Sequence, residues 1–570
     1  MSAAAVRCEA DAVSAPHGMS LNALPRLEFA CKNVKVSAPT KREYSRLQMH
    51  RFSSGTGLCR ARHARFLLTL ICALVAPSGW AAEAAPPASM PRAAKSAPPA
   101  SPFRAPAPPR YSALRYDFEY PVIGYSDTPS HNSFARLQQR LDKGEVKLEW
   151  RAPRGYLDSL LKALNIDKSS QGLVFSKTSL EITYITEQTP RAIYFNDETY
   201  VAWVQGGPSL ELMAVDSVIG PVFYTLPNRD PAVAARLDRE TLRCLNCHDS
   251  FSLAGGGVPH FLMVSTNAGV EGDRAQRSAS IDTSDATPMK SRWGGWYVTG
   301  HNDDQPHLGN IVIKSQQDLD RLDSLHRDDI DTLRGVFDTS PYLTDKSDNV
   351  ALMVLAHQVT VHNLITRANF KSRSIAARDL DTTANPNPRW SDFSPRVQKA
   401  MTAIFEPLVR GLLNADSAPF ASPMTGSSGF DAWFQKQGPK DARGRSLREL
   451  DLRTRLFRYP LSYLIYSDGF EGLPEYGKRY VYTRVAEVLR GQDHDSTFAW
   501  LTAADREAML EILSATKPAF VAATRPPSGA SSSGIASSAG TACGNESAAT
   551  SLACEAPAPA RPSAYSSSRS

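Results

Sequence analysis

Hydrophobic and polar residues change their spacing along the chain, from a strand-like pattern before residue 230 to a helical one after residue 316. Segments 192–207 and 210–226 are rich in β-branched and aromatic residues and contain Asn-Asp and Gly-Gly-Pro turn signals. Segment 180–186, LEITYIT, has a similar composition. Together these segments predict a small antiparallel sheet, preceded by a short helix over residues 155–166.

In the second pattern, apolar residues recur every three and four positions, which is typical of amphipathic helices. The segments with this spacing are 318–337, 348–370, 395–413, 480–491 and 502–515. Thr502 is the expected N-cap of the last helix.

The predicted fold class is therefore α+β. Residues 110–230 are expected to form a β-rich N-terminal region with a small antiparallel sheet. Residues 231–315 form a loop-rich middle, and residues 316–520 a mainly helical C-terminal half. These roughly 410 residues are enough for two or three packed subdomains.

The two ends of the chain differ from this core in composition. Residues 85–109 are mostly Pro and Ala and predict an extended linker. Residues 521–570 are mostly Ser, Ala, Gly, Pro and Thr and predict a disordered tail.

A secretory signal is expected just before the linker. Three arginines, Arg60, Arg62 and Arg65, precede an apolar run over residues 66–76, and an Ala-x-Ala sequence follows at 82–84. The run is too short for a bilayer core, which needs about 20 residues. We therefore expect a cleaved signal peptide over residues 49–84, a start at Met49, a mispredicted extension over residues 1–48, and no transmembrane anchor in the mature chain.

The formal net charge is +6, and no run of Lys or Arg stands out. This charge is modest for 570 residues. It does not indicate binding to nucleic acid or to a membrane surface.

The strongest chemical signal is the sequence CLNCH, Cys244 to His248. A Cys-x-x-Cys-His motif is typical of c-type haem attachment, with two thioether bonds and the adjacent His as proximal iron ligand. Zinc would need more ligands at short spacing, yet the next cysteine after Cys247 is Cys543. A redox dithiol remains possible, although its chemistry does not require the His. Covalent haem attachment also agrees with export, so we expect a periplasmic or otherwise secreted protein with one haem c.

Several strings occur in a characteristic order: SQGLVFSKTSLEITYITEQTPRAIYFNDETYVAWVQGG, CLNCHDS, SRWGGWYVTGHNDDQPHLGN, LMVLAHQVTVHNLITRANF and YPLSYLIYSDGFEGLP. With these, the region 111–518 resembles a family of large extracytoplasmic cytochrome c-type proteins. The resemblance implies haem binding and secretion but no particular reaction. The family pattern has a His a few residues before the Arg-Trp-Gly-Gly string, and this chain has none there.

The sequence offers several candidates for the iron ligand opposite His248. His307 lies in a loop next to Gly309, after a glycine-flanked aromatic strand, at a position similar to an HMGN-like motif of the family. We expect His307 to be this ligand, followed by His357, with an open site as another alternative. The complete set of candidates is His260, Met263, Met289, His301, His307, His326, His357 and His362.

These features predict a monohaem c-type cytochrome that transfers electrons, with a redox partner protein or a small-molecule electron donor or acceptor. Two alternatives remain: a haem enzyme with an exchangeable sixth iron position, and a haem-based binding or sensor protein. A carrier needs only about 100 residues, the size of a typical domain. Most of the core is therefore available for another task.

Overall fold

The structure is a computed structural model that describes residues 117–230, 235–249, 257–276, 278–322, 329–380 and 384–525. The predicted extension 1–48, signal peptide 49–84 and linker 85–109 lie outside these residues. His326 also lies outside them, as do residues 526–570 of the predicted tail. The first residues assigned to that tail belong instead to a helix that ends at Thr524.

An antiparallel sheet of seven strands organises the described N-terminal part, with strand order β10-β1-β2-β3-β4-β5-β6. Two further sheets have two strands each, β11-β8 and β7-β9. The strands are β1 (Gly172–Val174), β2 (Arg191–Phe195), β3 (Thr199–Trp203), β4 (Ser209–Asp216), β5 (Gly220–Pro227), β6 (Asp238–Glu240), β7 (Val264–Thr266), β8 (Ala268–Gly269), β9 (Ser280–Asp282), β10 (Trp296–Tyr297) and β11 (Val312–Ile313).

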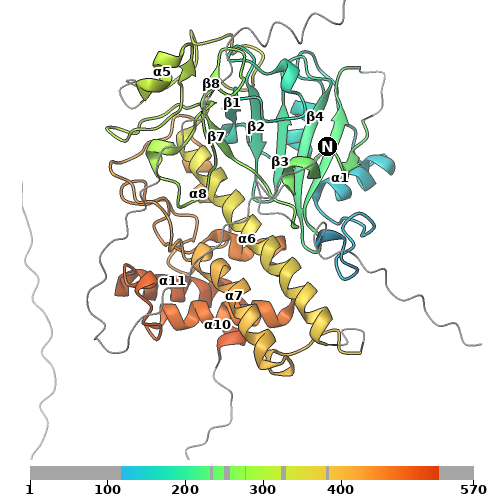
Figure 1. Cartoon of the computed structure of the whole chain (residues 1–570), viewed down its shortest axis with the longest axis vertical. Coiled ribbons are helices and arrows are strands. Elements are labelled where there is room, and N and C mark those ends of the chain that lie inside the picture. The colour runs from blue at the N-terminus through green and yellow to red at the C-terminus, as the bar shows by residue number, and fades with distance from the viewer. Residues whose placement is uncertain are drawn as a thin grey trace, which may run out of the picture. The chain divides into compact units, whose positions relative to one another are not determined.

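Helices make up most of the described residues between 349 and 525 (Figure 1). The α-helices are α1 (Ser133–Asp142), α2 (Leu157–Ala163), α3 (Leu245–His248), α5 (Gln316–Asp320), α6 (Asn349–Asp379), α7 (Pro395–Leu412), α8 (Phe430–Lys436), α9 (Asp468–Glu471), α10 (Glu475–Leu489), α11 (Ala503–Thr516) and α12 (Pro518–Thr524). The 3-10 helices are η1 (Asp117–Glu119), η2 (Lys168–Ser170), η3 (Ile182–Tyr184), η4 (Met289–Ser291), η6 (Trp390–Asp392), η7 (Tyr463–Tyr466) and η8 (Ser496–Phe498). The mixed α+β class is confirmed.

Both faces of the large sheet are buried, because side chains that alternate along each strand enter two different cores. Phe195 and Tyr200 belong to the core that also contains α6. Tyr194 and Val201, their neighbours in sequence, belong to the core that contains α1 and α2. A sheet covered on both sides needs apolar residues at nearly every position, which explains the dense apolar strands of this region.

Helix α6 connects the sheet to the helical part of the chain. In Figure 1 it runs from the sheet toward α7, α10 and α11. Leu352 packs against Gly172 of β1, and Thr366 packs against Gly220 of β5. Asp348 caps the helix by accepting a hydrogen bond from the N–H of Ala351 at 3.0 Å. No helix in the described part of the chain is long and apolar enough to cross a bilayer.

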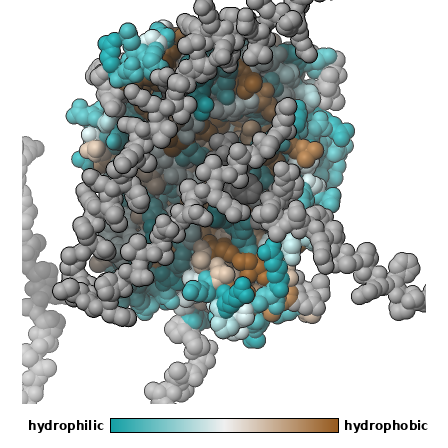
Figure 2. Space-filling model, in the orientation of Figure 1, coloured by the Kyte–Doolittle hydropathy of each residue, from teal (hydrophilic) through white to brown (hydrophobic). Residues whose placement is uncertain are grey.

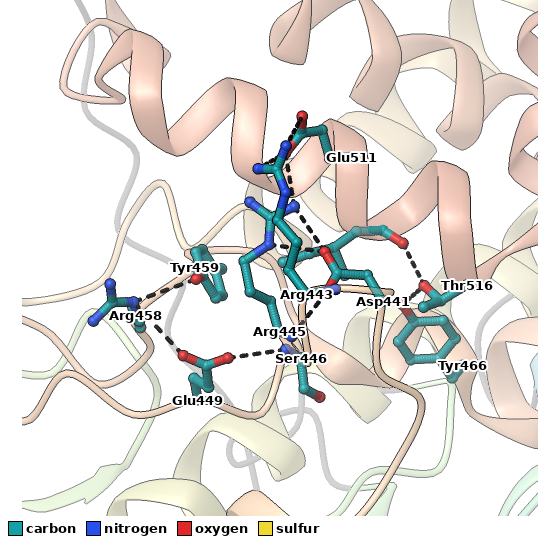
Figure 3. A network of polar contacts seen from close by, with 11 residues as sticks. Asp441, Arg443, Arg445, Ser446, Glu449, Arg458, Tyr459, Tyr466, Glu511 and Thr516 are labelled. Atoms are coloured by element: carbon teal, nitrogen blue, oxygen red, sulfur yellow. Dashed lines mark hydrogen bonds and ion pairs between the residues drawn. The ribbon is translucent and has the colours of Figure 1, made fainter. Parts of the chain in front are cut away.

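A charged network attaches α11 to the loop that follows α8 (Figure 3). Arg445 donates to Glu511 of α11 at 2.7 Å and to Asp441 at 2.8 Å, and Arg443 donates to Glu511 at 3.0 Å. Burial opposes ionisation of Asp441, but hydrogen bonds from the backbone and side chain of Arg445 outweigh it and lower the pKa of that carboxyl.

The described surface shows no single apolar face in the view of Figure 2, where brown and teal residues are interspersed. Large exposed apolar residues come from distant parts of the chain. They include Leu180, Val218, Leu242, Val336 and Trp500.

Two sequence predictions of local structure are wrong. Segment 180–186 is not a strand but contains η3, and its side chains Leu180 and Ile182 are 42% and 44% exposed. Of the predicted helix 318–337, residues 318–320 belong to α5, residues 323–328 lie outside the described part of the chain, and residues 330–337 contain isolated bridges instead.

Candidate functional site

The Cys-x-x-Cys-His motif forms one helical turn, α3, soon after strand β6. Cys244 is the residue before the helix, and its carbonyl accepts from the N–H groups of Cys247 at 3.2 Å and His248 at 3.0 Å. Residues three apart share one side of a helix, so both thiols belong to the same side of this turn. Cys244 is half-buried, Cys247 is exposed, and both are free thiols.

The chain reverses after α3 and returns to it at His260. The N–H of His260 donates to the carbonyl of His248 at 2.8 Å. In the other direction, the Nδ1 atom of His248 lies 2.7 Å from the carbonyl oxygen of His260. Both hydrogen bonds use backbone atoms of His260, so neither depends on which side chain stands at this position.

This geometry determines the tautomer of His248. A carbonyl oxygen can only accept, so Nδ1 must carry the proton, and in the neutral ring Nε2 then has a bare lone pair. Within the described residues, Nε2 has no hydrogen-bond partner. A histidine that binds a metal usually donates its other ring N–H to a carbonyl or carboxylate, and His248 is arranged in this way.

Aromatic and charged side chains surround the imidazole of His248. Its ring packs on Phe223 of β5, with ring centroids 4.5 Å apart. Phe261 lies behind Phe223 at 6.4 Å, and the ion pair of Arg191 and Glu211 (3.1 Å) is close enough to influence the charge of the ring. Burial is the main cause that lowers the pKa of His248 to about 4. The ring is therefore neutral at pH 7, as a metal ligand must be.

The first thiol is not poised for disulfide chemistry. Burial, with a smaller contribution from Glu240, raises the pKa of Cys244 to about 12. The attacking cysteine of a redox dithiol usually has a lowered pKa, because the thiolate is the nucleophile. The structure thus favours other uses of this cysteine pair.

A zinc site is not supported either. Zinc in structural sites takes four ligands from cysteine, histidine and carboxylate groups. In the part of the chain that the structure describes, no three such side chains are grouped so that they could hold a metal ion.

His307 lies at the opposite edge of the sheet from His248. Its ring packs edge-on against Trp293 at 5.1 Å, and its Nδ1 accepts from the N–H of Gly309 at 3.0 Å. The same loop is attached to β10 because the N–H of Asn310 donates to the carbonyl of Trp296 at 2.9 Å.

The spacing of the strands separates the two histidines. Strands β10 and β5 are five neighbours apart in the sheet, which is about 24 Å at roughly 4.8 Å for each pair. Two nitrogens on opposite sides of one metal are only about 4 Å apart, because each bond is about 2 Å long. The structure therefore does not bring His307 to the iron position expected at His248.

His357 is fully buried and uses both ring nitrogens elsewhere. Nδ1 lies 2.9 Å from a carboxylate oxygen of Asp285, and Nε2 lies 2.8 Å from Oγ of Ser462. The order of groups is that of a Ser-His-Asp triad. Ser462 is fully buried, however, and its Oγ also accepts from the N–H of Leu464 to cap η7. This chain of hydrogen bonds joins three segments and does not present a nucleophile to a substrate.

The remaining candidate ligands contact residues outside the Cys-x-x-Cys-His motif. His362 lies 2.8 Å from the carbonyl of Asp197 through Nε2. His301 is half-exposed, with Nε2 3.2 Å from Asp331. Met263 and Met289 are buried in the core that contains α6.

His260 is the candidate that the structure places beside His248. Its carbonyl accepts from Nδ1, on the other side of the imidazole ring from Nε2. The sequence could not identify this carbonyl, because any residue at position 260 supplies one. It also gave no signal for Phe223, which the pairing of β5 with β6 places opposite Glu240, shortly before the motif.

Comparison with family models, curated proteins and solved structures found no match to this chain. Its function is therefore inferred from the residues of the site.

Proposed function

We propose that this protein carries one c-type haem, attached through Cys244 and Cys247, with His248 as the axial iron ligand. The observation that carries this proposal is the orientation of His248. Its Nδ1–H donates to the carbonyl of His260, which leaves the Nε2 lone pair for a metal. The two free thiols lie on the same turn, as attachment to both edges of one haem requires.

The residues around the motif fit such a group. Phe223 packs against the imidazole and limits its rotation. The mutual backbone hydrogen bonds of His248 and His260 fix the turn on which the ring stands. When bound, the haem iron would supply one-electron transfer. The protein residues would hold the ligand in one tautomer and one orientation.

We infer that the protein works in the periplasm or outside the cell, in agreement with the expected signal peptide. Its organisation would follow the three expected regions: a β-rich region at 110–230, a haem-attachment region at 231–315 and a helical region at 316–520. Its partner would be a redox protein or a small-molecule electron donor or acceptor.

One observation favours the alternative function of a haem enzyme or sensor. The structure engages His301, His307, His357 and His362 in contacts away from α3, and His260 lies on the side of His248 that faces away from the iron. A sixth position left to water or a small molecule would be exchangeable and would permit binding or catalysis there. Carbon monoxide binding to the reduced protein would distinguish this case from a closed electron carrier.

Covalent attachment can be tested by acid–acetone extraction of the protein secreted from a host that matures c-type cytochromes. Wild-type protein should keep its haem in the precipitate, whereas the double variant Cys244→Ser/Cys247→Ser should carry none. The single variants should yield little stable holoprotein. Retention of haem by the double variant would refute covalent attachment at this motif.

A further inference from the structure

A cavity in the helical part of the chain is lined by a buried cation, Arg292, one of whose guanidinium nitrogens has no hydrogen-bond partner. The cavity measures about 370 Å³ and lies between α6, residues 414–420 and residues 454–460. Its wall includes Arg292, whose residue is only 1% exposed. This position is separate from the motif at Cys244.

Arg292 donates only to neutral groups. Its Nε bonds the carbonyl of Thr287 at 2.8 Å, and one Nη2 bonds the carbonyls of Ser284 at 2.8 Å and Asp285 at 3.0 Å. The Nη1 atom is buried without a partner. Burial lowers the pKa of Arg292 to about 10, while the nearby carboxylate of Asp285 acts in the opposite direction. A buried guanidinium with an unused donor is costly unless something compensates it.

The other charged groups in the wall are already engaged. The carboxylate of Asp285 accepts from His357 at 2.9 Å. Arg455 donates to Asp505 of α11 at 2.7 Å. Arg292 is therefore the cation in this wall that, among the described residues, has hydrogen bonds only to backbone carbonyls, and its Nη1 remains available to an incoming anion.

The rest of the lining is largely apolar and aromatic. It includes Met353 of α6 and the side chains of Phe420, Phe457 and Pro460. Trp500, which is 40% exposed, connects the cavity to the surface. A mostly apolar pocket with one precisely placed polar group is the usual form of a small-molecule site.

We propose that this cavity binds a small monocarboxylate with an apolar alkyl or aryl body. The carboxylate would accept from Arg292, and the body would pack against the aromatic lining and Trp500. A phosphate or a dicarboxylate fits less well, because the second negative charge would lie in apolar surroundings beside Asp285. The site is independent of the haem proposed above.

Isothermal titration of the mature full chain would test this with sodium salts of unbranched monocarboxylates of four to ten carbons and with 3-phenylpropionate. At least one acid should bind with one-to-one stoichiometry, and its primary amide at least tenfold more weakly. Arg292→Met should weaken the acid at least tenfold. Absence of binding by every acid at 10 mM, or equal binding of acids and amides, would overturn the proposal.

Arg292 also donates to backbone carbonyls of the loop at 284–287, so Arg292→Met can weaken binding by disturbing this loop. A second variant is therefore needed. Trp500→Ala removes a partly exposed wall and should weaken binding several-fold without disturbing the core. Leu242→Ala is the matched control, because this apolar side chain is 77% exposed and lies outside the cavity. Wild-type affinity in Trp500→Ala, or in a folded Arg292→Met protein, would contradict the assignment.

Discussion

The orientation of His248 depends on a backbone carbonyl, and this decides which side chains near it matter. The carbonyl of His260 accepts from Nδ1 whatever side chain residue 260 carries. The side chain of His260 instead turns back to the carbonyl of Val258 through its own Nδ1. At the scale of the residue, the proposed iron ligand His248 therefore depends on the backbone carbonyl of residue 260 and not on the side chain at that position.

Replacing His260 by Ala should preserve the haem site. The carbonyl remains, so the holoprotein should keep its haem content and its absorption spectrum, with some loss of stability from the buried side chain. Absorption spectra of the ferric and ferrous variants provide the measurement. A change in the iron spin state would mean that the imidazole of His260, and not only its carbonyl, acts on the iron.

His307→Ala should also leave the spectrum unchanged, because His307 packs on Trp293 at the other edge of the sheet. The variant should instead lose stability, since the N–H of Gly309 loses its acceptor; a lost buried hydrogen bond costs about 1–3 kcal/mol. Urea unfolding gives the stability and the visible spectrum gives the spin state. Conversion of the ferric iron from low to high spin would show that His307 does bind it.

His362 makes the fold sensitive to acid. Burial is the main cause that lowers its pKa from 6.5 to about 4. Between these values the unfolded chain binds more protons than the folded one, so stability falls as the pH drops from 6.5 toward 4. At about 1.4 kcal/mol for each pKa unit, the loss reaches about 3 kcal/mol. His362→Gln should flatten the pH dependence of the free energy of unfolding in this range; an unchanged slope would contradict the assignment.

Among the elements, those with a continuous local pattern were predictable from the sequence. The expected helix at 348–370 is part of α6, and Thr502 caps α11 through a box with Asp505. The failures have physical causes. Leu180 and Ile182 are exposed, so this apolar segment has no buried face that would favour a strand. The helix expected to reach residue 337 does not extend over residues 330–337, where Gly335 has a φ of +88° that does not fit a right-handed helix.

The contact between α9 and the β4–β5 turn shows how tightly the sheet and the helices meet. A Cβ atom on Gly472 would lie 1.8 Å from the backbone oxygen of Ser217. The side chain of Asn369 donates to the same oxygen at 3.2 Å and to the carbonyl of Gly472 at 3.3 Å. Only a residue without a side chain allows this approach.

Gly472→Ala should therefore destabilise the fold by about 1–3 kcal/mol or more, as overpacking does in other cores. Chemical unfolding followed by circular dichroism measures the loss. Gly444→Ala is a useful comparison, because a Cβ there meets no neighbour and only its φ of +77° opposes the change. Equal losses in both variants would show that crowding at Ser217 does not limit the fold.

At the scale of the whole molecule, a local sequence motif could be predicted from the sequence, whereas the pairing of distant strands could not. The Cys-x-x-Cys-His motif occupies five consecutive residues and is visible directly in the sequence. The position of His307 depends on the pairing of β10 with β1, which joins residues more than 120 positions apart, Leu173 and Tyr297. Hydrophobic pattern alone does not order the strands of a sheet, so the separation of His307 from His248 became evident only in the structure.

The central claim, one haem bound covalently at Cys244 and Cys247, is tested most directly by the intact mass of the secreted protein. Mass spectrometry under denaturing conditions should show the mature chain plus the mass of one haem, and tryptic digestion should place that mass on the peptide containing CLNCH. A chain without added mass after expression with haem-attachment machinery, or a haem mass on another peptide, would contradict the account.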